Sequence, residues 1–148
     1  MIKSSKLIMV LAGIVLGIIL IVFCKGFIKN SNISDIPKES EVAFIEIYAD
    51  SIGDITKHHT IEGEENITEI YDVFKSGKKS KSIKSLNDTP ADLDGKLTRI
   101  VLNDDSNTTT VLFAFQGKDG KAYIEKPYAA IYEISEENYE VLTKYFIE

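Results

Sequence analysis

Hydrophobic residues are spread very unevenly along this chain. Residues 7–24 (LIMVLAGIVLGIILIVFC) contain no charge, no proline and no strongly polar side chain. At a rise of 1.5 Å per residue, a helix of this length spans about 27 Å, close to the hydrocarbon thickness of a bilayer. The run therefore predicts a membrane-spanning helix, and the lipid bilayer is the first expected partner.

The end of this run leaves three interpretations open. A cleaved secretory signal has a shorter apolar segment followed by an A-x-A-like site, which Phe23-Cys24-Lys25 does not provide. A bacterial lipoprotein carries its lipid on a cysteine that follows a small residue, whereas Cys24 follows Phe23. We favour an uncleaved signal anchor and keep Cys24 as a candidate lipidation site.

Gly13 and Gly17 form a G-x-x-x-G spacing within the apolar run. This spacing lets two membrane helices approach closely, so the two glycines are a candidate dimer contact. Glycine is also common in membrane helices that do not pair. Both interpretations of these glycines remain open.

The chain after the anchor divides into a linker and one domain. Residues 1–28 form the expected anchor. Residues 29–40 (KNSNISDIPKES) form the expected linker, because the segment is polar and Pro37 opposes helix at the residue before it. We expect residues 41–148 to fold as one domain of common size. The short N-terminal tail and the large C-terminal part favour a single-pass cell-membrane protein with this domain outside the cytoplasm.

Helical periodicity appears twice in the domain. Between Gly63 and Gly77, four apolar residues recur at helical spacing, on one stripe of a 3.6-residue period. They are Ile67, Ile70, Tyr71 and Phe74. A second helix is predicted after Ser135, a favourable N-cap residue, and its inward residues are Tyr139, Leu142 and Phe146.

Alternating or β-branched stretches separated by turn residues predict strands. They are residues 41–50, 55–61, 97–102, 108–116, 121–126 and 128–134, with a short extended piece at 83–86. Pro127 should end a strand or place it at a sheet edge, because proline donates no ladder hydrogen bond. The element order is roughly ββαββββα, which predicts an α+β fold: a small antiparallel sheet with two helices packed on one face.

Charge excludes one class of partner. Lys3, Lys6, Lys25 and Lys29 lie in or beside the anchor, and removing them from the net charge of −6 leaves −10 for the rest of the chain. Nucleic acid is therefore not an expected partner, because phosphate neutralisation needs a basic face. The single cysteine permits no disulfide within the chain.

Candidate catalytic and metal-binding residues are few. His58 and His59 are the two histidines, and neighbours on a strand point to opposite faces, so they do not suit one metal ion. The acidic run at residues 104–107 lacks the spacing of a calcium loop. We find no nucleophile motif or phosphate-binding loop, and we expect no metal, no cofactor and no enzymatic activity.

Two candidate contact surfaces remain. The first is one basic island in an acidic domain, suited to lipid headgroups or an anionic wall polymer, although such loops are usually just hydrated. Its members are Lys75, Lys78, Lys79, Lys81 and Lys84. The second comprises Lys126, Pro127 and Tyr128, where a rigid proline and a tyrosine can present an edge to a partner chain. The alternative for Tyr128 is that it lines the core together with Tyr132.

Two segments of the second half resemble a known family. They are residues 85–90 (SLNDTP) and residues 119–134 (DGKAYIEKPYAAIYEI). They are similar to the DUF5301 family of uncharacterised small proteins of Gram-positive bacteria, in which an N-D-x-P and a Y-I-E-x-P-Y-x-x-I-Y-x-I run follow an anchor or lipoprotein signal. The resemblance implies extracytoplasmic placement and supplies no activity.

The function expected from the sequence is a membrane-tethered, extracytoplasmic binding or interaction module at the cell envelope. Its partner would be an unidentified protein, peptide or envelope component. One alternative is an accessory subunit whose anchor helix docks into a larger membrane complex. The other is an envelope hydrolase whose catalytic residues do not form a recognisable motif.

Overall fold

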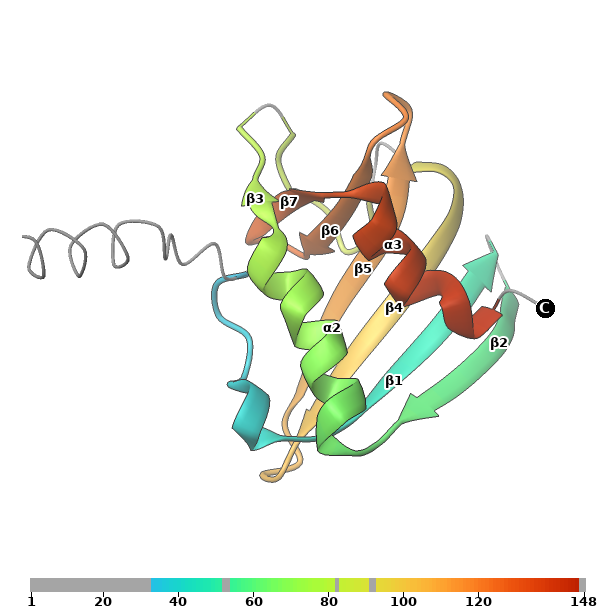
Figure 1. Ribbon diagram of the computed structural model, residues 1–148. Coiled ribbons are helices and arrows are strands. Elements are labelled where there is room, and N and C mark those ends of the chain that lie inside the picture. The colour runs from blue at the N-terminus through green and yellow to red at the C-terminus, as the bar shows by residue number, and fades with distance from the viewer. Residues whose placement is uncertain (1–32, 52–53, 82, 91–92, 147–148) are drawn as a thin grey trace, which may run out of the picture. The chain divides into compact units, whose positions relative to one another are not determined.

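The computed structural model describes residues 33–51, 54–81, 83–90 and 93–146 (Figure 1). All of them belong to one unit, Ser31–Glu148. Among these residues, no helix combines the length and apolar character needed to cross a membrane. The expected anchor at residues 7–24, with Gly13, Gly17 and Cys24, lies outside the described residues.

A seven-stranded sheet forms one layer of this unit, in the order β2-β1-β4-β5-β6-β7-β3. The strands are β1 (Val42–Ser51), β2 (Asp54–Ile61), β3 (Lys78–Lys79), β4 (Leu93–Asp104), β5 (Thr109–Gly117), β6 (Ala122–Lys126) and β7 (Ala130–Ile134). Every pairing is antiparallel. The predicted α+β class and antiparallel sheet are confirmed, with β3 as an additional strand.

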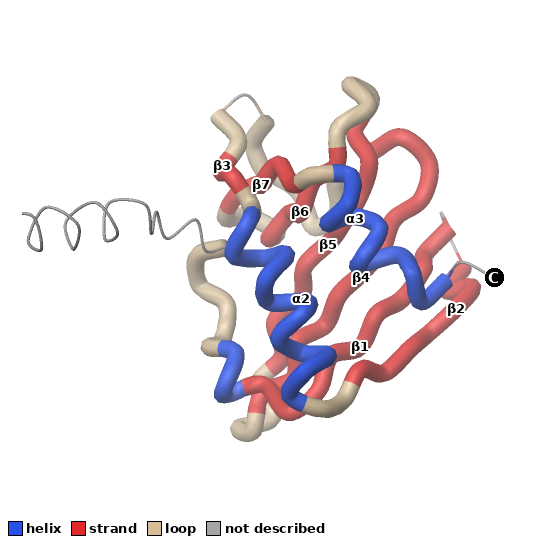
Figure 2. Tube along the Cα trace, in the orientation of Figure 1, coloured by secondary structure: helices blue, strands red, loops and turns tan. Residues whose placement is uncertain are grey.

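Two helices cover the same face of the sheet (Figure 2). Helix α2 (Glu64–Ser76) lies between Gly63 and Gly77, as predicted, and buries the four predicted apolar residues together with Val73. Helix α3 (Glu136–Thr143) begins after Ser135, whose hydroxyl accepts a 3.2 Å hydrogen bond from the Asn138 amide. This bond satisfies one of the amides that a helix start leaves without a partner. The described residues also contain two short 3-10 turns, η1 (Glu39–Glu41) and η2 (Lys144–Phe146).

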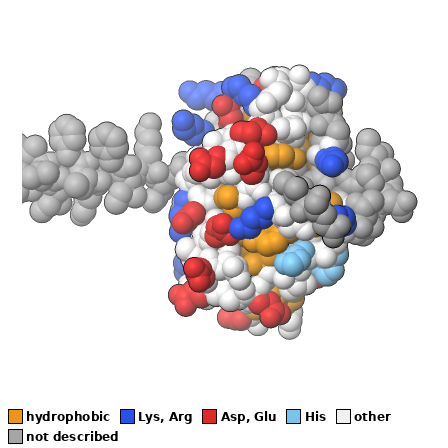
Figure 3. All heavy atoms as spheres, turned by 45° about the vertical axis from the view of Figure 1, so that its right-hand side comes forward, with side chains coloured by type: hydrophobic (Ala, Val, Ile, Leu, Met, Phe, Trp, Pro, Cys, Tyr) orange, Lys and Arg blue, Asp and Glu red, His pale blue; other side chains and the backbone are white. Residues whose placement is uncertain are grey.

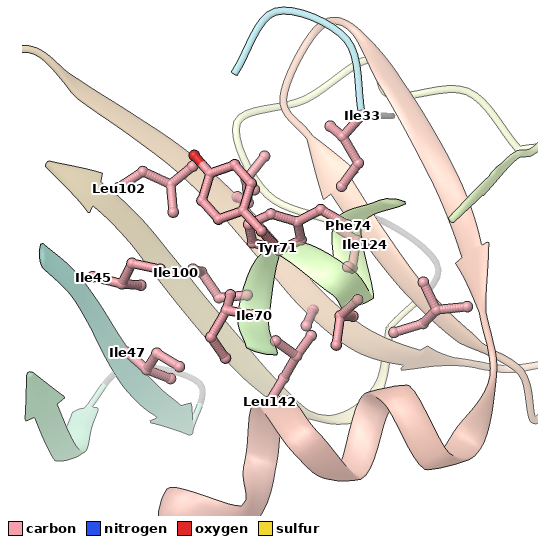
Figure 4. Packing of buried hydrophobic residues seen from close by; sticks show 14 of the residues in the cluster. Ile33, Ile45, Ile47, Ile70, Tyr71, Phe74, Ile100, Leu102, Ile124 and Leu142 are labelled. Atoms are coloured by element: carbon pink, nitrogen blue, oxygen red, sulfur yellow. The ribbon is translucent and has the colours of Figure 1, made fainter. Parts of the chain in front are cut away.

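The main hydrophobic core lies between the helices and the sheet (Figure 4). Alternate residues of β1 and β4 point toward the helices, because successive strand residues face opposite sides. The fully buried members include Ile45, Ile47, Ile70, Phe74, Ile100, Leu102 and Leu142. Burying each such side chain contributes roughly 1.5–3 kcal/mol.

The opposite face of the sheet carries a second, smaller cluster. Phe115, Tyr123 and Ile131, from β5, β6 and β7, are buried there, and Ile83 and Leu97 pack against them. Ile83 belongs to the chain that follows β3, so this loop covers part of the second face. The predicted extended piece at 83–86 is therefore no strand: it is the cover of the second cluster.

Residues 33–41 differ from the linker expected at 29–40. The Ile33 side chain is 2% exposed and belongs to the main core. The Tyr71 hydroxyl donates a 2.9 Å hydrogen bond to the Pro37 carbonyl, and Thr68 and Lys75 bind the Glu39 carboxylate. The linker was predicted because most of this segment is polar. Its two isoleucines, Ile33 and Ile36, nevertheless pack on the domain. The folded part therefore begins by Ile33 and not near Glu41.

Candidate interaction surface

The turn between β6 and β7 exposes a tyrosine. Residues 126–129 form a β-turn, in which the Ala129 amide donates a 3.1 Å hydrogen bond to the Lys126 carbonyl. Pro127 occupies the second position of this turn, and Tyr128, with φ of 59°, the third. Proline followed by a residue of positive φ is the combination that type II turns use. The turn leaves the Tyr128 side chain 64% exposed.

These positions correct two expectations for Lys126, Pro127 and Tyr128. Pro127 ends β6, as one interpretation predicted, but the segment is no sheet edge, since β7 and then β3 continue the sheet beyond β6. Tyr128 is not a core residue, whereas Tyr123 and Tyr132 are 2% and 3% exposed. The short turn reverses the chain at Tyr128 and so breaks the alternation that would have placed it beside Tyr132.

The loop at residues 83–90 is tied to this hairpin at two points. The Ser85 hydroxyl donates a 2.5 Å hydrogen bond to Glu125 Oε1, on β6. Three residues later, Asp88 Oδ1 accepts a 2.6 Å hydrogen bond from the Tyr128 hydroxyl. This bond raises the pKa of Tyr128, because the neighbouring carboxylate favours the protonated phenol. The two segments that carry the family resemblance therefore meet in space.

Leu86 lies between these two ties and is 70% exposed. Its neighbours Asn87, Asp88 and Thr89 are exposed as well. Large apolar side chains usually lie inside a folded domain, and ties on both sides of Leu86 hold its backbone in place. Leu86, Asp88 and Tyr128 define what we call the hairpin surface.

Glu125 is the unusual member of the tie beneath this surface. Its side chain is 2% exposed, and its Oε2 atom has no hydrogen-bond partner among the described residues. Burial raises the pKa of the Glu125 carboxyl, and the Ser85 hydrogen bond opposes this rise. Ser85 is itself 9% exposed. Because both groups are buried and neither borders the two hollows described below, we interpret the pair as a structural tie.

The expected basic island is divided by the structure. Lys75 contacts Glu39 at 2.9 Å and Asp72 at 3.0 Å, so it belongs to an ion-pair group on α2. Lys78 and Lys79 form the edge strand β3, and Lys81 and Lys84 lie in the loop after it. All four of these side chains are exposed. No carboxylate of the described residues forms an ion pair with any of the four.

Sequence reasoning missed a column of stacked side chains across β2, β1 and β4. The His58 and Tyr48 rings stack with centroids 4.5 Å apart, and the Arg99 guanidinium lies 4.5 Å from the Tyr48 centroid. His58 Nε2 also lies 3.3 Å from Glu46 Oε1. His59 faces the other side of the sheet and stacks on Tyr145 at 4.9 Å. The two histidines thus have separate aromatic partners.

Two surface hollows lie along the N-terminal segment. One, of about 630 Å³, is bordered by residues 38–43 and by the start of α2 at Gly63, Glu64 and Ile67. The other, of about 220 Å³, lies between residues 33–39 and the α2 side chains of Tyr71, Phe74 and Lys75. No group of three or more metal-ligating side chains occurs among the described residues.

Fold and surface together define a small antiparallel α+β domain with an exposed, tethered hairpin surface. The chain belongs to the DUF5301 family, whose model matches residues 29–133 and carries the description "Domain of unknown function (DUF5300)". The resemblance inferred from residues 85–90 and 119–134 is thereby confirmed. No curated protein and no solved structure matches this chain.

Proposed function

We propose that this protein is a membrane-tethered binding domain whose partner docks on the hairpin surface. The observation that carries the proposal is the exposure of Leu86 and Tyr128, at 70% and 64%, on two segments that hydrogen bonds hold together. A rigid aromatic ring and an aliphatic side chain on two joined segments provide contact area at low entropic cost, as binding surfaces require. The partner suited to this surface is a protein or peptide.

The ties at Asp88 and Glu125 support a binding role for the surface. They fix the loop before a partner arrives, so binding loses less conformational entropy than it would with a mobile loop. Asp88 and Lys126 add one acidic and one basic group close to the apolar pair. A polar margin around an apolar centre is the usual arrangement of an interaction surface.

The membrane part of the proposal rests on the apolar run at residues 7–24. In this proposal the run is an uncleaved signal anchor and the domain is outside the cytoplasm. Protease added to intact protoplasts should then remove the domain, whereas full protection would refute this orientation. An intact mass showing loss of residues 1–23 and a lipid on Cys24 would establish a lipoprotein instead.

Site-specific photo-crosslinking in the native membrane tests the docking surface. A benzophenone amino acid replaces Leu86 or Tyr128. In a control chain it replaces Val111, the third exposed large apolar residue among those that the structure describes, at 37% exposure. Positions 86 and 128 should give the same discrete adduct, and position 111 should not. Equal adducts at all three positions, or no adduct at positions 86 and 128, would contradict the proposal.

A further inference from the structure

We propose that the edge of the sheet at β3 binds an anionic lipid surface. The basic edge comprises Lys78, Lys79, Lys81 and Lys84, and excludes Lys75 because its amine is held by Glu39 and Asp72. This inference rests on the proposed membrane anchor at residues 7–24. It concerns a second set of residues, none of which belongs to the hairpin surface.

Charge is the first observation in favour of this inference. Between Asp72 and Asp88 the chain carries five lysines and no acidic residue, although residues 31–148 have a net charge of −10. Figure 3 shows acidic side chains spread over the visible face, a group of basic side chains at its upper left margin, and further basic side chains near its centre and on its right-hand side. A basic group this local is attracted to an anionic surface even when the domain as a whole is acidic.

The geometry of the edge leaves its lysines available. β3 is the last strand of the sheet and pairs on one side with β7, opposite Glu133 and Tyr132. Glu133 lies across from Lys78, but its carboxylate contacts the Lys121 amine at 2.9 Å. Lysines on an edge strand and in the loop that follows it can reach a flat surface together.

The N-terminal segment reaches the domain next to this edge. The Ser34 hydroxyl lies 3.1 Å from the Tyr132 hydroxyl, and Tyr132 pairs with Lys79 in the sheet. The Lys126 amine donates a hydrogen bond to the Asp35 carbonyl at the same corner. Nine residue steps separate Cys24 from Ile33, and a fully extended chain covers at most about 32 Å in nine steps. A membrane anchor ending at Cys24 would therefore keep this corner near the bilayer.

A lipid surface fits these observations better than a soluble anionic polymer. The four lysines lie on an edge and a loop, and neither hollow of the described residues is lined by any of them. A flat array of headgroups needs no groove. It also needs the lysines within about 8 Å, the screening length at physiological ionic strength, and the connection of at most about 32 Å is long enough to permit that approach.

Lysine acylation followed by peptide mass spectrometry tests the contact on the full chain. The protein is reconstituted into vesicles of phosphatidylcholine alone, or of phosphatidylcholine with phosphatidylglycerol, and treated briefly with a water-soluble acylating reagent. In the anionic vesicles, acylation of the basic edge should slow about fivefold, the factor expected for one lysine at an anionic surface. Lys57 and Lys118, elsewhere on the domain, are the internal controls and should react equally in both vesicles.

The outcomes separate this inference from the proposed function. Protein that resists alkaline extraction from neutral vesicles, yet shows equal acylation of the basic edge in both lipids, keeps the anchor and overturns the lipid contact. If alkaline extraction releases the protein from neutral vesicles, the proposed membrane anchor is wrong. Slower acylation of the basic edge in the anionic vesicles would then still support the lipid contact, and an equal rate in both lipids would contradict it. If soluble glycerol-phosphate polymer protects the edge on neutral vesicles while phosphatidylglycerol does not, the surface binds polymer and the lipid proposal is wrong.

A pair of charge-matched variants adds a second test. In Lys81→Gln with Lys84→Gln, protection of the remaining Lys78 and Lys79 by anionic vesicles should fall by at least half. In Lys57→Gln with Lys118→Gln, which removes the same charge elsewhere, the protection of Lys78 and Lys79 should be unchanged. Equal loss in both variants would show that net charge alone, and not this edge, sets the response.

Discussion

The Tyr128 hydroxyl donates a 2.6 Å hydrogen bond to the Asp88 carboxylate, forty residues earlier in the chain. The bond joins the turn after β6 to the loop that covers the second face of the sheet. With the Ser85–Glu125 bond, it fixes both ends of the segment that exposes Leu86. The proposed binding surface therefore depends on contacts between distant parts of the chain.

Tyr128 and Tyr132 should differ sharply in their effect on stability. Tyr128→Ala should lower the free energy of unfolding by less than about 1 kcal/mol, because the lost hydrogen bond is exposed to water. Tyr132→Ala should lower it by about 3 kcal/mol or more, because a buried ring leaves a cavity. Chemical denaturation of residues 31–148, which contain both hydrophobic clusters, measures both values. A loss of about 3 kcal/mol or more in Tyr128→Ala would show that Tyr128 is a core residue.

Ile33 should contribute to the stability of the domain. Ile33→Ala removes a side chain that is 2% exposed and should cost about 2 kcal/mol or more. Ile36→Ala, at a partly buried position in the same segment, is the matched control and should cost less. The denaturation midpoints of the two variants measure these losses of stability. If neither variant changes the denaturation midpoint, residues 29–40 are a linker, as expected from the sequence.

Glu125 should make stability depend on pH in a definite direction. Its pKa is raised in the folded state, above the ordinary value of 4.5, because burial disfavours the carboxylate. The folded state therefore keeps the Glu125 proton to higher pH than the unfolded state does. Ionisation of Glu125 lowers the free energy of unfolding, and this loss is complete above the folded-state pKa. Below pH 4.5 the Glu125 carboxyl is mostly protonated in both states, so its burial causes no loss of stability there.

Glu125→Gln removes this titration while keeping the shape of the side chain. The stability of the variant relative to the unmodified domain should rise as the pH increases from 4 toward 8. Glu137→Gln, at an exposed position of α3, is the control for the removal of one carboxylate. Thermal melts across this pH range make the comparison. A difference that stays constant with pH would show that Glu125 does not titrate anomalously.

Folding should require no metal ion. Melting curves of residues 31–148 with and without a chelator should coincide, because the histidines of the described residues stack on Tyr48 and Tyr145 and no set of metal ligands gathers around them. A fall of more than a few degrees on chelation would contradict this. His58→Ala and His59→Ala would then locate the ligand.

The sequence predicted those parts of the fold that local patterns determine. The stripe Ile67–Phe74, the Ser135 cap and the strand alternation each depend on neighbours within one or two turns. β3 escaped prediction because two lysines carry no hydrophobic pattern, and its pairing with β7 depends on residues more than fifty positions away. Ile33 was missed because its burial depends on the main core of the domain, while its own surroundings in sequence are polar.

The candidate surface was predicted only as far as its residues belong to one segment. The Pro127-Tyr128 dipeptide indicated a strand end, but its exposure follows from the turn at residues 126–129. The Ser85–Glu125 tie and the His58–Tyr48–Arg99 column join residues from separate elements. No spacing rule in the sequence connects them: sheet register sets the column, and the path of the loop over the second face of the sheet sets the Ser85–Glu125 contact.

The most direct test of the binding proposal is the yield of the photo-crosslinked adduct from position 86 in variants of the hairpin surface. The probe replaces Leu86 in the full chain in its native membrane, and the yield is normalised to folded protein. Tyr128→Ala should lower the yield about tenfold, as loss of an anchoring aromatic side chain does, and Val111→Ala should leave it unchanged. An unchanged yield in Tyr128→Ala, or an equal loss in both variants, would contradict the proposal.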